Sequence, residues 1–251
     1  MEKKLIKLFI ATPAYSKEVN TDYVSSILNL ISFRQTDDLK FSVHIHFEPG
    51  ICYVNLARNN CVNAFLKSGC DKMLFVDSDI SFTPQAVIRL LNFDSEIVIT
   101  PYPIKGYLNN SSGLNFTLNF PDDKNIKLDK NGFCEISSGP TGFMMIDKSV
   151  FFKMQNAFPE KKFTLKHVRE AKEEIVDNFN YFDTNTNEAG FIGEDIHFCN
   201  EWRKIGGKIY ADTITKLAHH GKNAYVGNVD KYLENLKTKN FVKIVENIKD
   251  N

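Results

Sequence analysis

The chain has 251 residues, of which 43% are hydrophobic and 25% are charged, as in an ordinary globular domain. Its 31 Lys and Arg residues balance its 31 Asp and Glu residues, whereas a protein that chiefly binds duplex nucleic acid usually carries a basic excess. No apolar run approaches the roughly 20 residues that a membrane-spanning helix needs. The composition therefore argues against a nucleic-acid partner and against an integral membrane protein.

The five cysteines include no Cys-x-x-C pair, so neither a disulfide framework nor a zinc site is expected. Free thiols are typical of the reducing cytosol. The chain starts with basic residues and a short apolar stretch, but Lys7 interrupts that stretch and favours a buried first strand over a signal peptide. We therefore expect a cytoplasmic protein.

The first hundred residues alternate between strand and helix patterns. Short apolar runs or period-two alternation predict strands at Lys7–Ala11, Phe41–Phe47, Lys72–Val76 and Glu96–Thr100. Apolar spacing and capping residues predict helices after Asn20-Thr21-Asp22, at Val54–Lys67 and after Thr83-Pro84. This alternation predicts βαβ units and a mainly parallel sheet.

The second half has a different pattern. Alternating segments at Gly113–Phe120 and Phe133–Ser137 predict antiparallel strands added to the sheet, and Phe143–Ile146 predicts another buried strand with a helix after it. The polar residues 156–190 are interpreted as loop-rich. A helix is expected from Gly193-Glu194 to Gly206-Gly207, and a last short strand at Lys208–Ala211.

The C-terminal residues 230–251 predict an amphipathic helix that packs on the domain formed by residues 1–229. Its apolar positions have helical spacing, and Lys residues occupy its other face. A basic amphipathic helix can also lie on an anionic membrane surface, so peripheral membrane contact is the alternative to packing.

An acidic pair follows the strand at Lys72–Val76. Asp77, Ser78 and Asp79 come directly after four apolar residues, at the carboxyl end of a buried strand, where open α/β sheets bind ligands. Residues two apart in a strand point the same way, so both carboxylates can share a divalent ion, and oxygen ligands favour Mg²⁺ or Mn²⁺. The alternative is that both acids are turn residues that cap the next helix.

The first predicted strand is followed by a segment that can contact a nucleotide. Thr12, Pro13, Ala14 and Tyr15 follow it at the same sheet edge, where Tyr15 can stack on a base. A plain turn with an exposed tyrosine is the alternative.

Two more segments are candidates for ligand contact. Arg58 and Asn59 lie on the helix that leads to the acidic pair, and a guanidinium suits bidentate recognition of a phosphate. Gly142 lies in a glycine-containing bend that lets a substrate approach the backbone closely. The alternatives are a surface arginine and a structural turn.

The last two candidates lie in the final third of the chain. Glu194 and Asp195 open a helix, where acids are favoured by the helix dipole, and a carboxylate there can accept a proton from a hydroxyl group. His219 and His220 precede Gly221, and one imidazole can complete the coordination of an ion held by Asp79. Exposed loop histidines are the alternative.

The order of these segments resembles that of GT-A-fold glycosyltransferases, including the family-two-like enzymes and their small relatives in bacteria, phages and large DNA viruses. The segments are T-P-A-Y, A-R-N-N, D-S-D, S-G-P-T-G-F-M-M-I, G-E-D-I-H-F-C and H-H-G, over roughly residues 5–225. The resemblance implies an α/β fold with a Rossmann-like, mixed and mainly parallel sheet flanked by helices, a small antiparallel addition and a C-terminal helix.

The resemblance also implies a reaction. The donor would be a nucleotide-diphosphate sugar, with UDP preferred, and the acceptor a glycan or a lipid-linked hydroxyl group. Asp77 would lie near the ribose or base, and Asp79 would bind Mn²⁺ or Mg²⁺. Asp195 would be the base of an inverting enzyme, with Glu194 as its competitor. His219 would complete the metal site, with His220 as second choice.

Alternatives from other classes stay open. The chain has no Q-x-x-R-W motif, only Glu201-Trp202-Arg203, so a processive polysaccharide synthase is not expected. Asp77-Ser78-Asp79 also fits the first motif of haloacid-dehalogenase-like phosphohydrolases, but that motif normally ends the first strand, and the later G-D-x-x-x-D motif is missing. A non-catalytic module that binds a nucleotide sugar or a glycan is the third interpretation.

Overall fold

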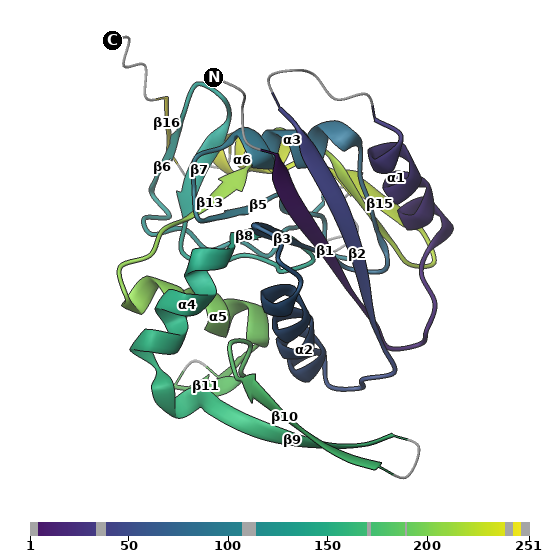
Figure 1. Cartoon of the computed structure of the whole chain (residues 1–251). Helices are drawn as coiled ribbons and strands as arrows, with labels where there is room; N and C mark the ends of the chain where they lie inside the picture. The colour runs from purple at the N-terminus through teal and green to yellow at the C-terminus, as the bar shows by residue number, and fades with distance from the viewer. Residues whose placement is uncertain are drawn as a thin grey trace.

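The computed structural model describes residues 5–33, 39–106, 114–169, 172–188, 190–238 and 243–246. A nine-stranded sheet forms its centre, in the order β16-β6-β7-β13-β5-β8-β3-β1-β2 (Figure 1). Its strands are β1 (Ile6–Ala14), β2 (Phe41–Pro49), β3 (Lys72–Val76), β5 (Ile97–Ile99), β6 (Asn125–Leu128), β7 (Phe133–Ile136), β8 (Phe143–Asp147), β13 (Ile209–Asp212) and β16 (Lys243–Glu246).

Most strands of the sheet run in the same direction. Strands β7 and β8 pair antiparallel with both of their neighbours, and the other seven strands run in one common direction. The predicted α/β class with a mixed, mainly parallel sheet is therefore confirmed.

Helices cover both faces of the sheet. They are α1 (Thr21–Ile31), α2 (Val54–Lys67), α3 (Pro84–Asn92), α4 (Lys148–Ala157), α5 (Glu194–Lys204) and α6 (Val229–Thr238). Strand side chains alternate between faces: Leu8 and Ile10 of β1 pack in the cluster that contains α1 and α3, while Phe9 and Ala11 pack in the cluster that contains α2, α4 and α5.

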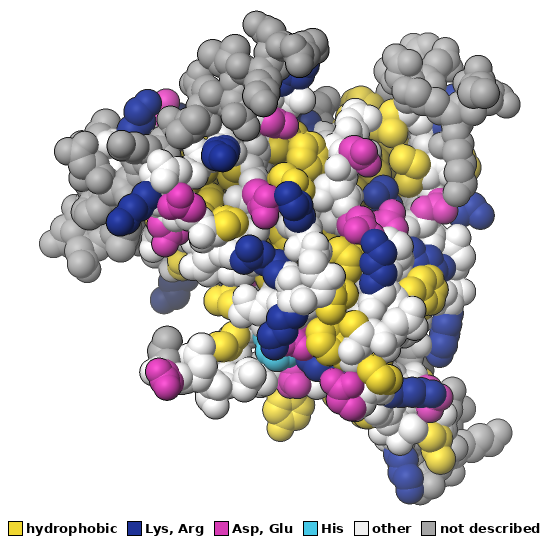
Figure 2. Space-filling model, turned by 90° about the vertical axis from the view of Figure 1, so that its left-hand side faces the viewer, with side chains coloured by type: hydrophobic (Ala, Val, Ile, Leu, Met, Phe, Trp, Pro, Cys, Tyr) yellow, Lys and Arg dark blue, Asp and Glu magenta, His cyan; other side chains and the backbone are white. Residues whose placement is uncertain are grey.

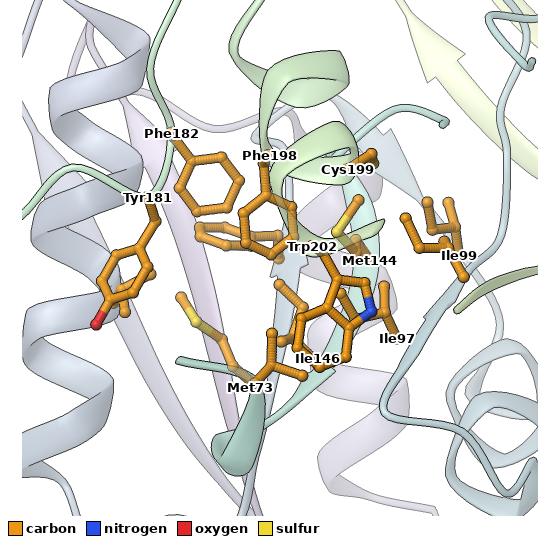
Figure 3. Packing of buried hydrophobic residues seen from close by; sticks show 14 of the residues in the cluster. Met73, Ile97, Ile99, Met144, Ile146, Tyr181, Phe182, Phe198, Cys199 and Trp202 are labelled. Atoms are coloured by element: carbon orange, nitrogen blue, oxygen red, sulfur yellow. The ribbon is translucent and has the colours of Figure 1, made fainter. Parts of the chain in front are cut away.

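The cluster that contains α2, α4 and α5 is the larger of the two. Phe198, Cys199 and Trp202 of α5 lie over sheet residues such as Met144 and Ile97 (Figure 3). Because all of these side chains are almost fully buried, the position of α5, and with it the start of that helix, depends on this packing.

The predicted loop-rich segment 156–190 contains two hairpins. Strands β9 (Lys162–Arg169) and β10 (Lys172–Phe179) pair antiparallel, as do β11 (Asn185–Asn187) and β12 (Gly190–Ile192). The longer hairpin extends away from the body of the protein (Figure 1). Its residues are rich in charged and polar side chains, and its few apolar residues do not alternate regularly, so the sequence carried no clear strand pattern.

Two further expectations about elements are corrected. The strand Gly113–Phe120 is absent over residues 114–120, where only the single bridges Pro103–Phe116 and Asn119–Ser138 form. The strand predicted at Lys7–Ala11 is longer, because β2 pairs with β1 as far as Ala14, so Thr12–Ala14 belong to the strand and not to a turn.

The C-terminal expectation is also corrected. Helix α6 covers Val229–Thr238, but Lys243–Glu246 form strand β16 instead of further helix, paired in parallel with β6. The rest of the predicted helix, residues 239–242 and 247–251, lies outside the described residues. The edge of β6 presents backbone N–H and C=O groups that a strand can pair with and a continued helix cannot.

The described residues contain no helix that is long and apolar enough to cross a membrane. The five cysteines are all free, and four of them are buried. On the face shown in Figure 2, basic and acidic side chains are interspersed, in keeping with the balanced charge.

Candidate functional site

The carboxyl end of β3 brings two distant segments together. Strand β4 (Ile80–Ser81) follows Asp79 directly, and β14 (Leu217–His220) pairs antiparallel with it, so that His219 lies opposite Ile80. As a result, Nε2 of His219 is 3.6 Å from Oδ2 of Asp79. The backbone N–H of His220 donates to the carbonyl of Asp79 over 2.8 Å, which fixes this register.

The imidazole of His219 is held in one orientation. Its Nδ1 is 2.8 Å from the carbonyl oxygen of Pro103, and the ring of Tyr102 packs edge-on against it. A carbonyl oxygen only accepts, so Nδ1 carries a proton and Nε2 is directed to Asp79. A metal-binding histidine is usually oriented in the same way, through its other nitrogen.

The two histidines have different surroundings. Nε2 of His220 is 2.8 Å from the hydroxyl of Ser81, and Nδ1 is 3.5 Å from a carboxylate oxygen of Asp22. Neighbouring strand residues point to opposite sides, which is why His220 does not join His219 at Asp79. Of the two predicted metal-binding histidines, the structure brings only His219 to the acidic pair.

Asp79 is paired with a cation that the sequence reasoning missed. The ammonium of Lys105 contacts Oδ2 of Asp79. Burial opposes ionisation of Asp79, but the favourable interactions of its carboxylate with His219 and Lys105 outweigh it and lower its pKa to about 2.

Asp77 takes part in a separate buried network. Arg58 donates from two nitrogens to the two oxygens of Asp77, over 3.1 and 3.4 Å, and from Nε to Glu194 over 3.3 Å. Its guanidinium also lies over the ring of Phe75. Burial alone would lower the pKa of Arg58, but the attraction of Asp77 and Glu194 raises it above its usual value.

This network corrects the role of Arg58. Only 4% of the residue is exposed, and its donors are engaged by two carboxylates. It is therefore placed to orient Asp77 and Glu194 and not to bind a phosphate directly. The two acids therefore have different partners: Asp77 contacts Arg58 and Tyr102, whereas Asp79 contacts Lys105 and lies near His219.

Tyr102 and Gly142 complete the surroundings of Asp77. The hydroxyl of Tyr102 donates to Oδ2 of Asp77 over 3.4 Å, and the carbonyl of Gly142 accepts from the backbone N–H of Asp77 over 3.0 Å. A Cβ atom at Gly142 would lie 2.3 Å from the Tyr102 hydroxyl and 2.4 Å from Asp77. Any larger residue at position 142 would therefore displace the side chains of Tyr102 and Asp77.

Tyr102 and Lys105 could have been found from the sequence. Both follow the predicted strand Glu96–Thr100, and in an open α/β sheet the segments after the strands line the ligand-binding edge. The isolated tyrosine and lysine formed no motif, so this positional signal was the only one available.

Asp195 and Glu194 lie at the start of α5. Glu194 is turned to Arg58, whereas Asp195 accepts the backbone N–H of Ile196 over 2.7 Å. Burial, and then the negative charge of Glu194, raise the pKa of Asp195 above its ordinary value. This direction is opposite to the effect of the helix dipole alone, because desolvation and a like charge outweigh it.

The remaining predicted residues have mixed placements. Thr12 is buried and its hydroxyl is 2.7 Å from that of Tyr23, and Asn59 ties α2 to residues 180–182. Ala14 is also buried, while Tyr15 is 66% exposed and accessible to a ligand. Pro13 and Ser78 are partly exposed; the carbonyl of Ser78 accepts the N–H of Asn20, the residue that caps α1. Thr12 and Asn59 are therefore structural in this arrangement.

The side chains around Asp79 fit a divalent ion whose other ligands come from a bound phosphate and from water. No cluster of three or more His, Cys, Asp or Glu side chains suited to a metal occurs in the described parts of the chain. Asp79 and His219 supply one oxygen and one nitrogen, which suit Mn²⁺ or Mg²⁺ when phosphate and water oxygens complete the shell. The ammonium of Lys105 already occupies a cation position at Asp79.

Comparisons with known proteins give distant similarities of structure. No protein-family model and no curated protein sequence matches the chain. Among solved structures, A197 from STIV is 16% identical, with 90% of this chain and 91% of that chain covered and a TM-score of 0.48.

The S. aureus protein TarS (residues 1–349) is 13% identical, with 88% of this chain covered and a TM-score of 0.39. The structure of TarS 1–349 in complex with UDP-GlcNAc is also 13% identical, with 98% of this chain covered and a TM-score of 0.42. The chain covers 60% of the TarS 1–349 chain in both comparisons. At these identities and TM-scores, the similarities say nothing about the chemistry of this chain, which must be inferred from its own residues.

Proposed function

We propose that this chain is a glycosyltransferase that moves a sugar from a nucleotide-diphosphate donor, with UDP-sugars preferred, to a hydroxyl group of a glycan or lipid-linked acceptor. The observation that carries the proposal is the meeting of His219 and Asp79 at the carboxyl end of β3, with Nε2 and Oδ2 3.6 Å apart. An acid and an oriented imidazole at this edge suit a metal-bound diphosphate.

The residues around Asp79 have distinct tasks in this proposal. Asp79 and His219 would hold the Mn²⁺ or Mg²⁺ ion, which as a Lewis acid stabilises negative charge on the departing diphosphate. Asp77, oriented by Arg58 and Tyr102, is expected to accept from the ribose or base. The exposed ring of Tyr15 is available for stacking on the base.

Asp195 is the proposed general base. It would accept the proton of the acceptor hydroxyl as that oxygen attacks the anomeric carbon on the face opposite the diphosphate, which inverts the configuration. A raised pKa brings a carboxylate closer to the operating pH and makes it a better base. Glu194 is less suited, because its carboxylate is paired with Arg58.

The phosphohydrolase alternative has less support. Its mechanism needs the first acid of the D-x-D segment as a free nucleophile, but both oxygens of Asp77 accept hydrogen bonds from Arg58 and one also from Tyr102. A carboxylate held in this way is a weaker nucleophile.

The first test measures binding of the donor nucleotide. Calorimetric titration of the protein with UDP should give tighter binding with Mn²⁺ than with EDTA. Asp79→Asn should remove most of this difference, because Asp79 is one of the two side chains proposed to bind the ion. Asp177→Asn is the matched control, since Asp177 is an exposed acid on β10, paired with Lys162. Equal UDP affinity in Mn²⁺ and EDTA would contradict the metal-dependent donor site.

The second test separates the function classes. The protein is incubated with a panel of UDP-sugars and candidate hydroxyl acceptors, and UDP and inorganic phosphate are measured. Release of UDP with formation of a glycoside supports the transferase. Binding without turnover favours the non-catalytic module, and release of inorganic phosphate favours the phosphohydrolase.

A further inference from the structure

The side chain of Lys105 lies where the proposed ion would bind. Its ammonium contacts Oδ2 of Asp79, the same oxygen that is 3.6 Å from Nε2 of His219. The Lys105 ammonium therefore supplies, beside the carboxylate and the imidazole, the positive charge that a metal ion would supply there.

The position of Lys105 is built into the fold. It follows β5 in the segment whose Pro103 carbonyl accepts from His219, and the backbone N–H of Ile104 donates to the carbonyl of Asn115 over 2.8 Å. Its aliphatic stem runs along Gly221, where a Cβ atom would lie only 3.2 Å from Cδ of Lys105. Backbone bonds on one side and Gly221 on the other therefore direct the amine to Asp79.

We infer that Lys105 and the divalent ion are alternative cations for Asp79. In the free protein the ammonium neutralises Asp79. When the ion arrives with the diphosphate, the ammonium leaves Asp79 and pairs with the phosphate oxygens. This inference rests on the proposed function, because it needs a diphosphate as the second partner of Lys105.

The reason is electrostatic. Two cations on one carboxylate oxygen repel each other, and repulsion at such short range is strong in a partly buried site. A diphosphate supplies the additional negative charge that allows both cations to remain. Binding of metal without nucleotide is therefore suppressed, and metal and nucleotide bind with positive coupling, each raising the affinity for the other.

The experiment titrates the protein with Mn²⁺ alone, by calorimetry or by the loss of the free-Mn²⁺ paramagnetic resonance signal. Lys105→Met removes the charge and keeps the length of the stem, while Lys105→Arg keeps the charge. Lys153→Met is the matched control, because Lys153 forms a similar exposed pair with Glu96, away from Asp79. Circular dichroism melting curves verify that each variant is folded.

Lys105→Met should bind Mn²⁺ about threefold to tenfold more tightly than the wild type without nucleotide, the size expected when a partly exposed ion pair no longer competes. With Mn²⁺ saturating, its affinity for UDP should fall by a similar factor of about three to ten, because one phosphate partner is lost. Lys105→Arg and Lys153→Met should both behave like the wild type.

Two results would overturn the inference: an Mn²⁺ affinity of Lys105→Met equal to or below that of the wild type, including no binding by either protein, or the same change in the Met and Arg variants. Failure of the proposed function is distinguishable. In that case UDP would not bind the wild type with Mn²⁺ present, whereas an unchanged Mn²⁺ affinity together with normal UDP binding rejects only the exchange at Asp79.

Discussion

Asp195 and Glu194 are adjacent acids whose side chains do different things. Glu194 pairs with the buried Arg58, whereas within the described part of the chain Asp195 forms no ion pair and lies beside the like charge of Glu194. This division is what qualifies Asp195 as the base. Asp195→Asn keeps the size of the side chain but removes its basicity, so kcat should fall by roughly 10²–10⁴, the usual contribution of a general base.

Steady-state kinetics check this prediction, with UDP binding measured in parallel. The affinity for UDP should stay almost unchanged, because the diphosphate is assigned to Asp79, His219 and Lys105. NMR of the product should show the anomer opposite to that of the donor. Normal turnover of Asp195→Asn, or a retained configuration, would remove Asp195 from the role of base.

The pH dependence of kcat should reveal the influence of Glu194. The base must be ionised, so kcat falls as the pH drops through the pKa of Asp195, and burial and Glu194 both raise that pKa. Glu194→Gln removes the like charge, so the acid limb of the profile should move to lower pH. Asp79, whose pKa is about 2, stays ionised across that limb.

A pH–rate profile of the wild type and Glu194→Gln makes the comparison, and the position of the limb is read separately from the maximal rate. Loss of the pair with Arg58 can lower the rate without moving the limb. An acid limb at the same pH in both proteins would assign it to a group other than Asp195.

At the scale of elements, α2 positions the site through polar bonds as well as through packing. The amide of Asn59, only 2% exposed, donates to Asn180 over 2.8 Å and accepts from the backbone N–H of Phe182 over 2.9 Å. These bonds hold residues 180–182 against the helix that carries Arg58.

Asn59→Ala should lower the free energy of unfolding by about 1–3 kcal/mol, because it leaves buried polar groups of residues 180–182 without partners. Urea denaturation measures the change. Asn63→Ala is the matched control on the same helix, since it removes one exposed bond, to the carbonyl of Asp177, and should cost much less. Equal losses for both variants would contradict the role of burial.

For the whole molecule, the packing of α5 on the sheet connects the stability of the core with the position of the proposed base. Trp202 is 2% exposed, and its indole N–H donates to the carbonyl of Lys208 over 3.1 Å. The same helix begins at Glu194 and Asp195. Loss of the indole therefore affects both the core and the site.

Trp202→Ala should lower the free energy of unfolding by about 3–5 kcal/mol, as large-to-small changes of buried aromatic residues do. Phe191→Ala is the control, because Phe191 is 75% exposed and its removal should leave stability nearly unchanged. Chemical denaturation of the two variants tests the difference. A similar small effect in both would show that α5 is not held by this packing.

Much of the fold follows from local patterns in the chain. The helix at Val54–Lys67 and the strand at Lys72–Val76 have the predicted bounds, because periodicity records which face of an element is buried. The same logic placed Asp77 and Asp79 at the carboxyl end of a buried strand and Asp195 at the start of a helix. Local sequence therefore determined the identity of most candidate residues and the edge of the sheet where they gather.

Tertiary structure alone decided which of these residues meet. The pairing of β14 with β4 selects His219 over His220, since adjacent strand residues face opposite sides. Packing turns Arg58 to two carboxylates, and the segment after β5 brings Lys105 to Asp79. Periodicity shows that a face is covered but not which distant segment covers it, and a strand edge such as that of β6 can be completed by any segment able to pair with it. For that reason the strand at Lys243–Glu246 and the partners within the site could be known only from the folded chain.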